Sequence, residues 1–351
     1  MVRRSDGPRR RTLQDVADAL GLTANTVSRA LNDKPGVSAA TRALIKAEAE
    51  RIGYVPNAHA RSLVLGSRKT IGVIVTDLAN PFFNDLVSEI EEQAIGAGYT
   101  VMLLLSDEDP DRERAAIDTA LRAGVDGIIG VPVQGRGSPW SVVEKAGIPL
   151  VLAAREAPGT DVDFYSNDNE AGRRMTTDVI IDRGARDIVV IEEDLRISTV
   201  AHRVTGYRHA LERRNIPFDS HNILLVPSRR TMRGASLWRG EDAYRVASEL
   251  LDSGRRPDAF IVGNDYFALG LYTALRERGI RIPEDVLIIG WGDYPFSRFL
   301  DPPLSTLRLP SVEVARRAST RLLQLLDGSA DPGKVVEYIQ PELVLRGSTN
   351  R

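Results

Sequence analysis

A series of short apolar runs, separated by amphipathic segments, extends from residue 70 to residue 291 and constrains the fold more than any other feature. Apolar runs of this length are typical of parallel strands buried on both faces, and the amphipathic segments predict covering helices. The predicted strands are TIGVIV (70–75), YTVMLLL (99–105), DGIIGV (126–131), IPLVLAA (148–154), RDIVVIEE (186–193), ILLVP (223–227), DAFIVG (258–263) and VLIIGW (286–291). The pattern predicts an α/β fold, and this many strands favour two parallel sheets over one.

Polar and aromatic residues follow the predicted strands. These strand ends are TDLANPFF (76–83), SDED (106–109), VPVQ (131–134), AREA (154–157), EEDLR (192–196), GND (263–265) and WGDY (291–294). Ligands of open α/β sheets bind outside the carboxyl ends of the strands, so these segments predict the lining of a cleft. The alternative is that such Asp and Asn residues only cap helices. We expect that capping role for Asp265, because a helix begins at Tyr266.

Several classes of protein do not fit the composition. The sequence has no Cys, and its four His residues (59, 202, 209 and 221) are not spaced as metal ligands. It contains no GxSxG, Walker or GxGxxG motif in a suitable context, so we expect neither an enzyme nor a cofactor. No apolar run is long enough to span a membrane, and the basic start MVRRSDGPRRR is not followed by the apolar run of a secretory signal. We therefore expect a cytoplasmic protein.

The net charge of −2 is divided unevenly along the chain. Residues 1–70 contain 13 Lys and Arg against 6 Asp and Glu, a charge of +7, which leaves −9 for the remainder. A basic head on an acidic body predicts a polyanionic partner for the head alone. The alternative is a solvated basic tail.

Residues 12–53 predict three short helices. TLQD (12–15) is a capping box in which Thr12 and Asp15 hydrogen-bond reciprocally to the backbone. Gly21 ends this helix, and Thr23 caps the next. Ser38 begins a third helix, which continues through Ile52. Its inward residues are expected to be Leu44, Ile45, Ala49 and Ile52.

Helix, tight turn and helix is the helix-turn-helix pattern, whose second helix enters the DNA major groove. The residues at the start of that helix would then face base edges. Asn25 suits a bidentate contact to adenine, and Ala24 suits a thymine methyl group. The candidate DNA-binding residues are Thr12, Thr23, Ala24, Asn25, Thr26, Ser28, Arg29 and Asn32. The alternative is a three-helix bundle with a polar surface.

The next stretch, YVPNAHARSLVLGS (54–67), predicts about two helical turns after Asn57. An isolated helix of that length is marginal in water, so it would need DNA or a second copy to form. Leu63 suits a wedge inserted between base steps in the minor groove. The alternative is a linker with incidental leucines.

TLQDVADALGLTANTVSRALN (12–32), GYVPNAHARSL (53–63) and IGVIVTDLANPFF (71–83) together give the chain a specific resemblance. The sequence resembles the lac repressor and purine repressor family of bacterial transcription regulators over nearly its whole length. The resemblance implies a homodimer on a double-stranded, pseudo-palindromic operator. It assigns the wedge to Leu63 and backbone contacts to Asn57 and Ala60. Because no leucine-heptad tail follows, we expect a dimer and not a tetramer.

The resemblance also implies a two-lobed, periplasmic-binding-protein-like domain that closes on a small-molecule effector. We expect a basic tail at 1–11, the helix-turn-helix domain at 12–56, a hinge helix with linker at 57–69, one lobe at 70–166 and 301–329, and the other at 167–300 and 330–351. The positions matching effector contacts are Phe82 and Phe83 with Asn80 beside them, Arg203, Trp238 and Asn264. Trp238 and Trp291 suit stacking on a sugar or base. The implied function is repression of a catabolic operon, released when a carbohydrate or related metabolite binds. The alternative is corepression, in which the effector strengthens DNA binding, as in purine-type relatives.

Two positions depart from the sugar-responsive pattern of that family. Ala154, before Arg155, stands where a carboxylate is usual, and Gly292 stands where Asp is usual. Losing both carboxylates while Arg155 and Arg203 remain favours an anionic effector, or one with fewer hydroxyls than a neutral sugar. The alternative is that Arg155 pairs with a structural carboxylate and Asp293 replaces the missing one.

Overall fold

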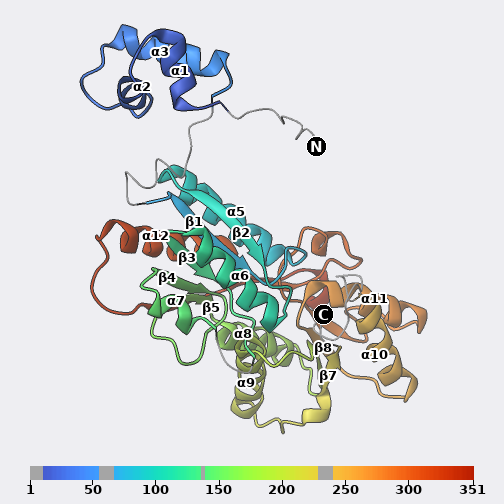
Figure 1. Cartoon of the computed structure of the whole chain (residues 1–351). Helices are drawn as coiled ribbons and strands as arrows, with labels where there is room; N and C mark the ends of the chain where they lie inside the picture. The colour runs from blue at the N-terminus through green and yellow to red at the C-terminus, as the bar shows by residue number, and fades with distance from the viewer. Residues whose placement is uncertain (1–10, 55–66, 136–138, 228–239) are drawn as a thin grey trace, which may run out of the picture. The chain divides into compact units, whose positions relative to one another are not determined.

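The computed structural model describes residues 11–54, 67–135, 139–227 and 240–351. The chain divides into two compact units, Met1–Arg68 and Lys69–Arg351. The first unit contains α1 (Leu13–Leu20), α2 (Ala24–Leu31) and α3 (Ala39–Arg51) (Figure 1). The capping box of Thr12 and Asp15 is present, and α1 ends at Gly21, whose φ of 62° is left-handed.

A small apolar core joins these three helices. Val16, Ala17, Val27 and Ala30 are fully buried in it, together with Ile45 from α3. Leu44 was predicted to face inward, but it is 56% exposed. The side chains of adjacent helical residues diverge, so Ile45 and Ala49 take the inward face and Leu44 points away from it.

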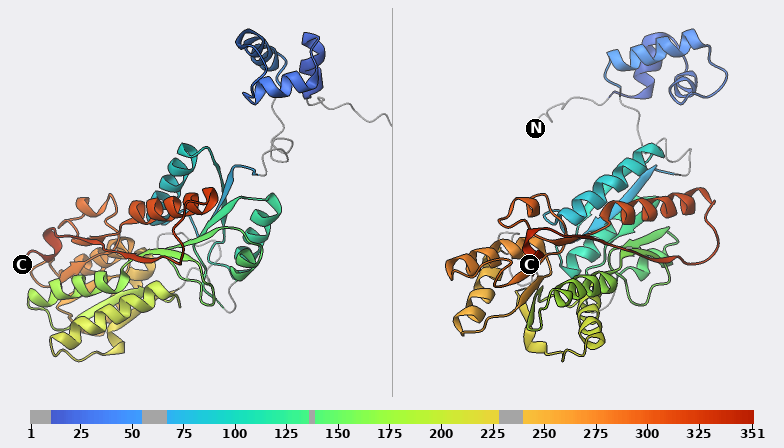
Figure 2. Two further views of the ribbon diagram at one scale, coloured as in Figure 1. Left: turned by 90° about the vertical axis from the view of Figure 1, so that its left-hand side faces the viewer. Right: turned by 180° about the vertical axis from the view of Figure 1, so that it is seen from behind.

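The second unit contains a first sheet of six parallel strands in the order β11-β5-β4-β3-β1-β2. The strands are β1 (Thr70–Val75), β2 (Thr100–Leu105), β3 (Gly127–Gly130), β4 (Leu150–Ala153), β5 (Asp163–Asn167) and β11 (Val336–Ile339). α5 (Pro81–Gly96) and α12 (Ser311–Asp327) cover one face, and α6 (Pro110–Ala123) and α7 (Ser141–Lys145) cover the other. Figures 1 and 2 show this layering.

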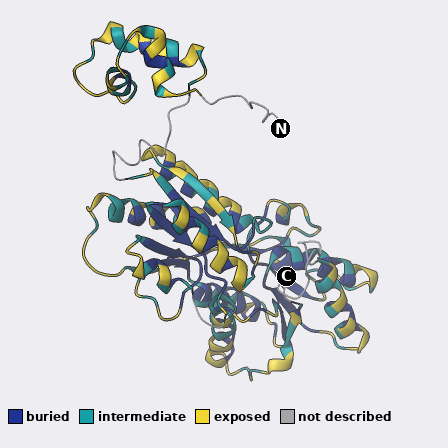
Figure 3. Ribbon diagram, viewed as in Figure 1, coloured by how far each residue is buried: buried dark blue, intermediate teal, exposed yellow. Residues whose placement is uncertain are grey.

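A second sheet has four parallel strands in the order β7-β6-β8-β9. They are β6 (Ile188–Glu193), β7 (Ile223–Val226), β8 (Ala259–Val262) and β9 (Leu287–Ile289). α8 (Asn169–Asp182) and α9 (Ser198–Arg213) pack on one face, and α10 (Gly240–Asp252) and α11 (Asp265–Glu277) pack on the other. The inner strands of both sheets are buried (Figure 3). The prediction of two parallel sheets in an α/β fold is confirmed, and none of the described helices is both long and apolar enough to cross a membrane.

Each sheet with its helices forms one lobe of the second unit. Near the C-terminus, the chain crosses between these lobes at other positions than expected. β10 (Thr306–Arg308) pairs antiparallel with β12 (Glu342–Val344) and bridges to Ile289 and Gly292 of the second lobe. α12 then packs on the first sheet, and β11 pairs with β5 in that sheet. The last two crossings therefore follow residues 308 and 339, a few residues after the expected positions near 300 and 330. The short β10 and β11 runs lack the long apolar pattern that would have revealed their sheets.

Candidate functional site: a helix-turn-helix surface and an interlobe pocket

The start of α2 presents a small polar surface. Thr23 caps the helix by accepting from the backbone N–H of Thr26 at 3.2 Å, and the two hydroxyls lie 2.9 Å apart. Asn25 is exposed, whereas Ala24 is half-buried against the core. Asn25 is therefore open to solvent at this helix start, and its amide takes no part in the cap that Thr23 forms.

Other DNA-contact candidates are engaged within the unit. The Arg29 guanidinium donates to the carbonyl of Pro35, at 3.1 Å from Nε, and so holds the loop after α2. Asn32 ends α2, and its amide donates to the carbonyl of Ser28 at 2.8 Å. Thr12 likewise caps α1. These side chains position the helices whether or not they also meet DNA.

Four predicted site residues, Asn57, Ala60, Leu63 and Trp238, lie outside the described residues. So do most of the expected hinge helix and basic tail.

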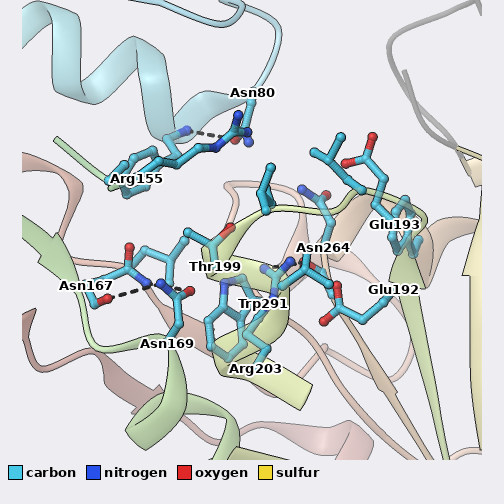
Figure 4. Close-up of a pocket in the computed structure, with 18 of the residues that line it drawn as sticks. Asn80, Arg155, Asn167, Asn169, Glu192, Glu193, Thr199, Arg203, Asn264 and Trp291 are labelled. Atoms are coloured by element: carbon cyan, nitrogen blue, oxygen red, sulfur yellow. Dashed lines mark hydrogen bonds and ion pairs between the residues drawn. The ribbon is translucent and has the colours of Figure 1, made fainter. Parts of the chain in front are cut away.

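In the second unit, the strand ends of both lobes line one pocket (Figure 4). The sequence-predicted residues that it brings together are Asn80, Phe82, Phe83, Arg155, Arg203, Asn264 and Trp291. Those that were not predicted include Asn167, Asn169, Glu192, Thr199, Tyr266 and Tyr294. The polar strand β5, DFYSN, was not predicted, so its end at Asn167 was missed. Glu192 and Tyr294 belong to predicted strand ends but had not been singled out.

Asn80 forms part of the first lobe's wall. Its side chain caps α5 by accepting from the backbone N–H of Phe82 at 3.1 Å, and Pro81 occupies the first turn, where its missing N–H costs nothing. Phe82 and Phe83 make an edge-to-face pair with ring centroids 5.4 Å apart. The wall is thus a rigid helix start with aromatic side chains beside it.

Arg155 is held by a structural carboxylate. Its guanidinium donates to both oxygens of Glu108, at 2.9 and 2.6 Å, and the two side chains are 5% and 2% exposed. Arg155 lines the pocket (Figure 4). Of the two interpretations of Arg155, the structure favours pairing with a structural carboxylate over a free cation awaiting a ligand.

Asp265 does not cap a helix, contrary to expectation. Asn264 is the cap of α11, and its side-chain oxygen Oδ1 accepts from the backbone N–H of Tyr266 at 2.9 Å. Asp265 is fully buried, and each of its oxygens accepts from one backbone N–H and one hydroxyl. The donors are Trp291 N (2.6 Å), Thr306 Oγ1 (2.7 Å), Tyr294 N (3.1 Å) and Ser297 Oγ (2.7 Å).

The fixed position of the loop after β9 follows from these bonds. Burial raises the pKa of the Asp265 carboxyl, while the four hydrogen bonds act in the opposite direction. A Cβ at residue 290 would lie 2.1 Å from the Asp265 carboxylate, so Gly290 permits this approach. Asp265 thereby positions Trp291 and Tyr294, both of which line the pocket.

Gly292 and Asp293 do not line the described pocket, so two sequence interpretations are corrected. Gly292 has a φ of 138°, and a Cβ there would lie 2.6 Å from the Tyr294 ring. The glycine is required by the backbone and does not mark a missing acceptor. Asp293 accepts from Arg308 at 2.8 Å and from Arg346 at 2.6 Å, so it ties the loop to the interlobe strands and does not replace a pocket carboxylate.

Trp291 is 2% exposed, and two guanidinium groups lie over its ring. Those of Arg173 and Arg203 are 5.0 and 5.2 Å from the ring centroid. Glu192 joins them, since its carboxylate accepts from Arg173 and, at 2.9 Å, from Arg203. The predicted stacking face of Trp291 is therefore already covered, and an ion cluster lies at this wall of the pocket.

Two sets of hydrogen bonds join the lobes beside the pocket. The hydroxyl of Tyr294 donates to the side-chain carbonyl of Asn80 at 2.9 Å and accepts from the Asn264 amide at 3.1 Å. Gln134 of the first lobe donates to the Ser198 hydroxyl at 2.9 Å and accepts from its backbone N–H at 2.7 Å. The two lobes are therefore bonded to each other beside the pocket. No cluster of His, Asp and Glu suited to a metal occurs in the described ranges.

Two family models match the chain. The model described as bacterial regulatory proteins of the lacI family covers residues 12–57, and a periplasmic binding protein-like domain covers residues 177–349. The chain is 28% identical over 338 residues to the HTH-type transcriptional repressor PurR of Pasteurella multocida, and 30% identical over 342 residues to PurR of Haemophilus influenzae. Each alignment covers 96% of this chain and 98% of the relative.

Solved structures agree with this similarity. The lac repressor dimer bound to operator and the anti-inducer ONPF superposes with a TM-score of 0.84 at 26% identity, over 97% of this chain and 99% of that one. A complex of the transcriptional regulator CelR with cellobiose has a TM-score of 0.69 at 26% identity, over 97% of this chain and 100% of that one.

Proposed function

The chain belongs to the lacI family of bacterial regulatory proteins and is a DNA-binding transcriptional repressor, and from that premise we propose that a small molecule in the interlobe pocket controls its hold on DNA. The observation that carries this proposal is that side chains from both lobes line one pocket. A ligand there contacts both lobes at once, so its binding energy depends on how they are closed.

The DNA partner is a double-stranded, pseudo-palindromic operator, bound by a homodimer. Each protomer places the start of α2 in a major groove, where Asn25 contacts a base edge. The capped start of α2 and the exposure of Asn25 support this assignment. Ser28, Arg29 and Asn32 lie further along the helix or at its end, where phosphate contacts are the more suitable role.

The hinge segment completes the DNA contact. Leu63 from each protomer enters the minor groove at the central step and bends the DNA, with Asn57 and Ala60 beside it against the backbone. This role rests on the resemblance of the sequence GYVPNAHARSL (53–63).

The effector is a carbohydrate or a related metabolite, and its binding releases the operator of a catabolic operon. The amides of Asn167, Asn169 and Asn264 offer donors and acceptors to such a ligand. Operator and effector affinities must then be coupled reciprocally, typically by about 1–3 kcal/mol. Since the operator lies on bacterial DNA, we expect the protein to act in the cytoplasm.

A gel-shift titration tests the DNA arm of this proposal. The probe is a pseudo-palindrome with a central CG step, and the competitor is a scrambled duplex of equal length. We expect preferential binding of the palindrome, which Leu63→Ala weakens while non-specific binding remains. Equal affinity for palindromic and scrambled duplexes over a library of half-sites would contradict the proposal.

A further inference from the structure

The ion cluster at the pocket wall does not balance its own charge. Arg173, Arg203 and Glu192 form one connected group in which a single carboxylate accepts from two guanidinium ions. Their side chains are 1%, 12% and 1% exposed, so little water reaches them. The group therefore carries a net charge of +1 in a largely dry environment, where an uncompensated charge is unfavourable.

Deprotonation does not relieve this surplus. Burial, opposed by the attraction of Glu192 and assisted by the neighbouring Arg203, lowers the pKa of Arg173 to about 10. The guanidinium thus stays protonated at neutral pH. The same cluster also has unused donors: Nε of Arg203 and both Nε and Nη1 of Arg173 find no hydrogen-bond partner within the described part of the chain.

The other arginine of the pocket differs in this respect. Arg155 is matched by one carboxylate, Glu108, in a two-bond pair. Of these two groups, the one that contains Arg203 has more guanidinium ions than carboxylates, whereas the pair that contains Arg155 has one of each. Arg203 lines the pocket directly, and Figure 4 shows it beside Trp291 and Asn264.

We propose that the effector carries an anionic group, a carboxylate or a phosphate, which binds at Arg203 while Arg173 and Glu192 fix the guanidinium in place. The proposal rests on the proposed function, because it takes the interlobe pocket as the effector site. The anion adds negative charge beside this group and accepts from the Arg203 guanidinium, which lines the pocket. The amides and the Thr199 hydroxyl of the lining hold the neutral part of the same molecule.

Isothermal titration of the full-length chain tests this site. The ligands are glucose, glucuronate and glucose 6-phosphate, which share a ring and differ in charge, with inorganic phosphate and acetate as the smallest anions of the two classes. We expect at least one anion to bind, and the two classes separate the carboxylate from the phosphate alternative. Arg203→Gln should weaken that binding roughly 10- to 100-fold, since it removes a charge-assisted hydrogen bond.

Glu192→Gln should change anion affinity in the opposite direction to Arg203→Gln. It removes the one negative charge of the cluster and frees an Arg203 donor, so anion binding should become tighter. Arg208→Gln is the matched control, because Arg208 lies on the same helix, is exposed and packs on Phe218 outside the pocket. This variant should bind the anion as the parent does. Circular dichroism establishes that each variant is folded before titration.

Three results would overturn the proposal: no binding of any anion, binding of neutral glucose alone, or equal binding by Arg203→Gln and the parent. Weaker anion binding by Glu192→Gln would also count against it. Operator binding is measured on the same preparations, so that failure of the anion site with intact DNA binding refutes only this inference. If the parent protein itself does not bind the palindromic duplex in preference to the scrambled one, the proposed function is refuted.

Discussion

The hydroxyl of Tyr294 lies 2.9 Å from the side-chain oxygen of Asn80, across the cleft between two lobes and 214 positions away in the chain. The same hydroxyl accepts from Asn264, so one side chain connects α5, α11 and the loop after β9. The hydroxyl oxygen of Tyr294 therefore takes part both in the contact between the lobes and in the position of the pocket residue Asn264.

Tyr294→Phe keeps the ring packed against Tyr266 and Phe296 but removes that hydroxyl. We expect the free energy of unfolding of the effector unit to fall by about 1 kcal/mol, the net value of a typical hydrogen bond. Urea unfolding of Tyr294→Phe, Asn80→Ala and the double variant measures the coupling, which should make the two losses less than additive. Tyr244→Phe is the control, since the Tyr244 hydroxyl donates to Glu277 within one lobe, and its effect should simply add to that of Asn80→Ala.

Asp265→Asn replaces one acceptor oxygen by an amide that can only donate. Each oxygen of Asp265 faces one backbone N–H and one hydroxyl, so in either orientation the amide nitrogen opposes a backbone N–H, and the hydroxyl beside it must turn to accept. We expect a loss of about 2–3 kcal/mol in the free energy of unfolding, measured from the urea midpoint. Asp252→Asn, at an exposed partner of Arg278, should change it by about 1 kcal/mol or less. A similarly small effect at Asp265 would show that the carboxylate does not hold the loop.

Glu113→Gln, unlike Asp265→Asn, should keep the hydrogen bonds of the buried carboxyl. Both donors to Glu113, the backbone N–H of Val133 and Trp140 Nε1, reach the same oxygen at 2.8 Å, so a glutamine amide can occupy the other position. Burial raises the pKa of this carboxyl above its ordinary 4.5. Its contribution to stability is therefore fully present below pH 4.5 and is lost as pH rises through the folded pKa.

Glutamine does not ionise, so the stability of Glu113→Gln relative to the parent should be constant below pH 4.5 and rise above it until the folded pKa is passed. Unfolding free energies measured at several pH values follow this difference. A difference that falls with increasing pH would mean that the folded state stabilises the ionised carboxylate.

Asn25→Ala should change base preference more than overall affinity. A bidentate contact to adenine is worth about 1–3 kcal/mol of discrimination at one base pair, and the substitution should remove it. Gel shifts with the four base pairs at each half-site position measure the change, and Glu50→Ala, on an exposed position of α3, is the control. An equal loss for every sequence would make Asn25 a phosphate contact.

The sequence by itself determined the helices of the first unit, eight strands of the second, and the pocket's location at strand ends. These features depend on neighbours within a few positions: Thr12 and Thr23 cap helices that begin at the next residue, and each buried strand is a continuous apolar run. The family resemblance also rests on contiguous motifs, which is why the two parallel sheets could be expected before any coordinates.

Only the tertiary structure decided how the charged side chains pair. Arg155 meets Glu108 from 47 positions away, and Asp265 receives donors from segments 26 to 41 positions further along. Nothing in the local pattern distinguishes a paired arginine from one with spare donors, because the pairing depends on which strand ends the chain crossings bring together. For the same reason Gly292 looked like a missing acceptor, although its backbone angle and the Tyr294 ring require glycine there.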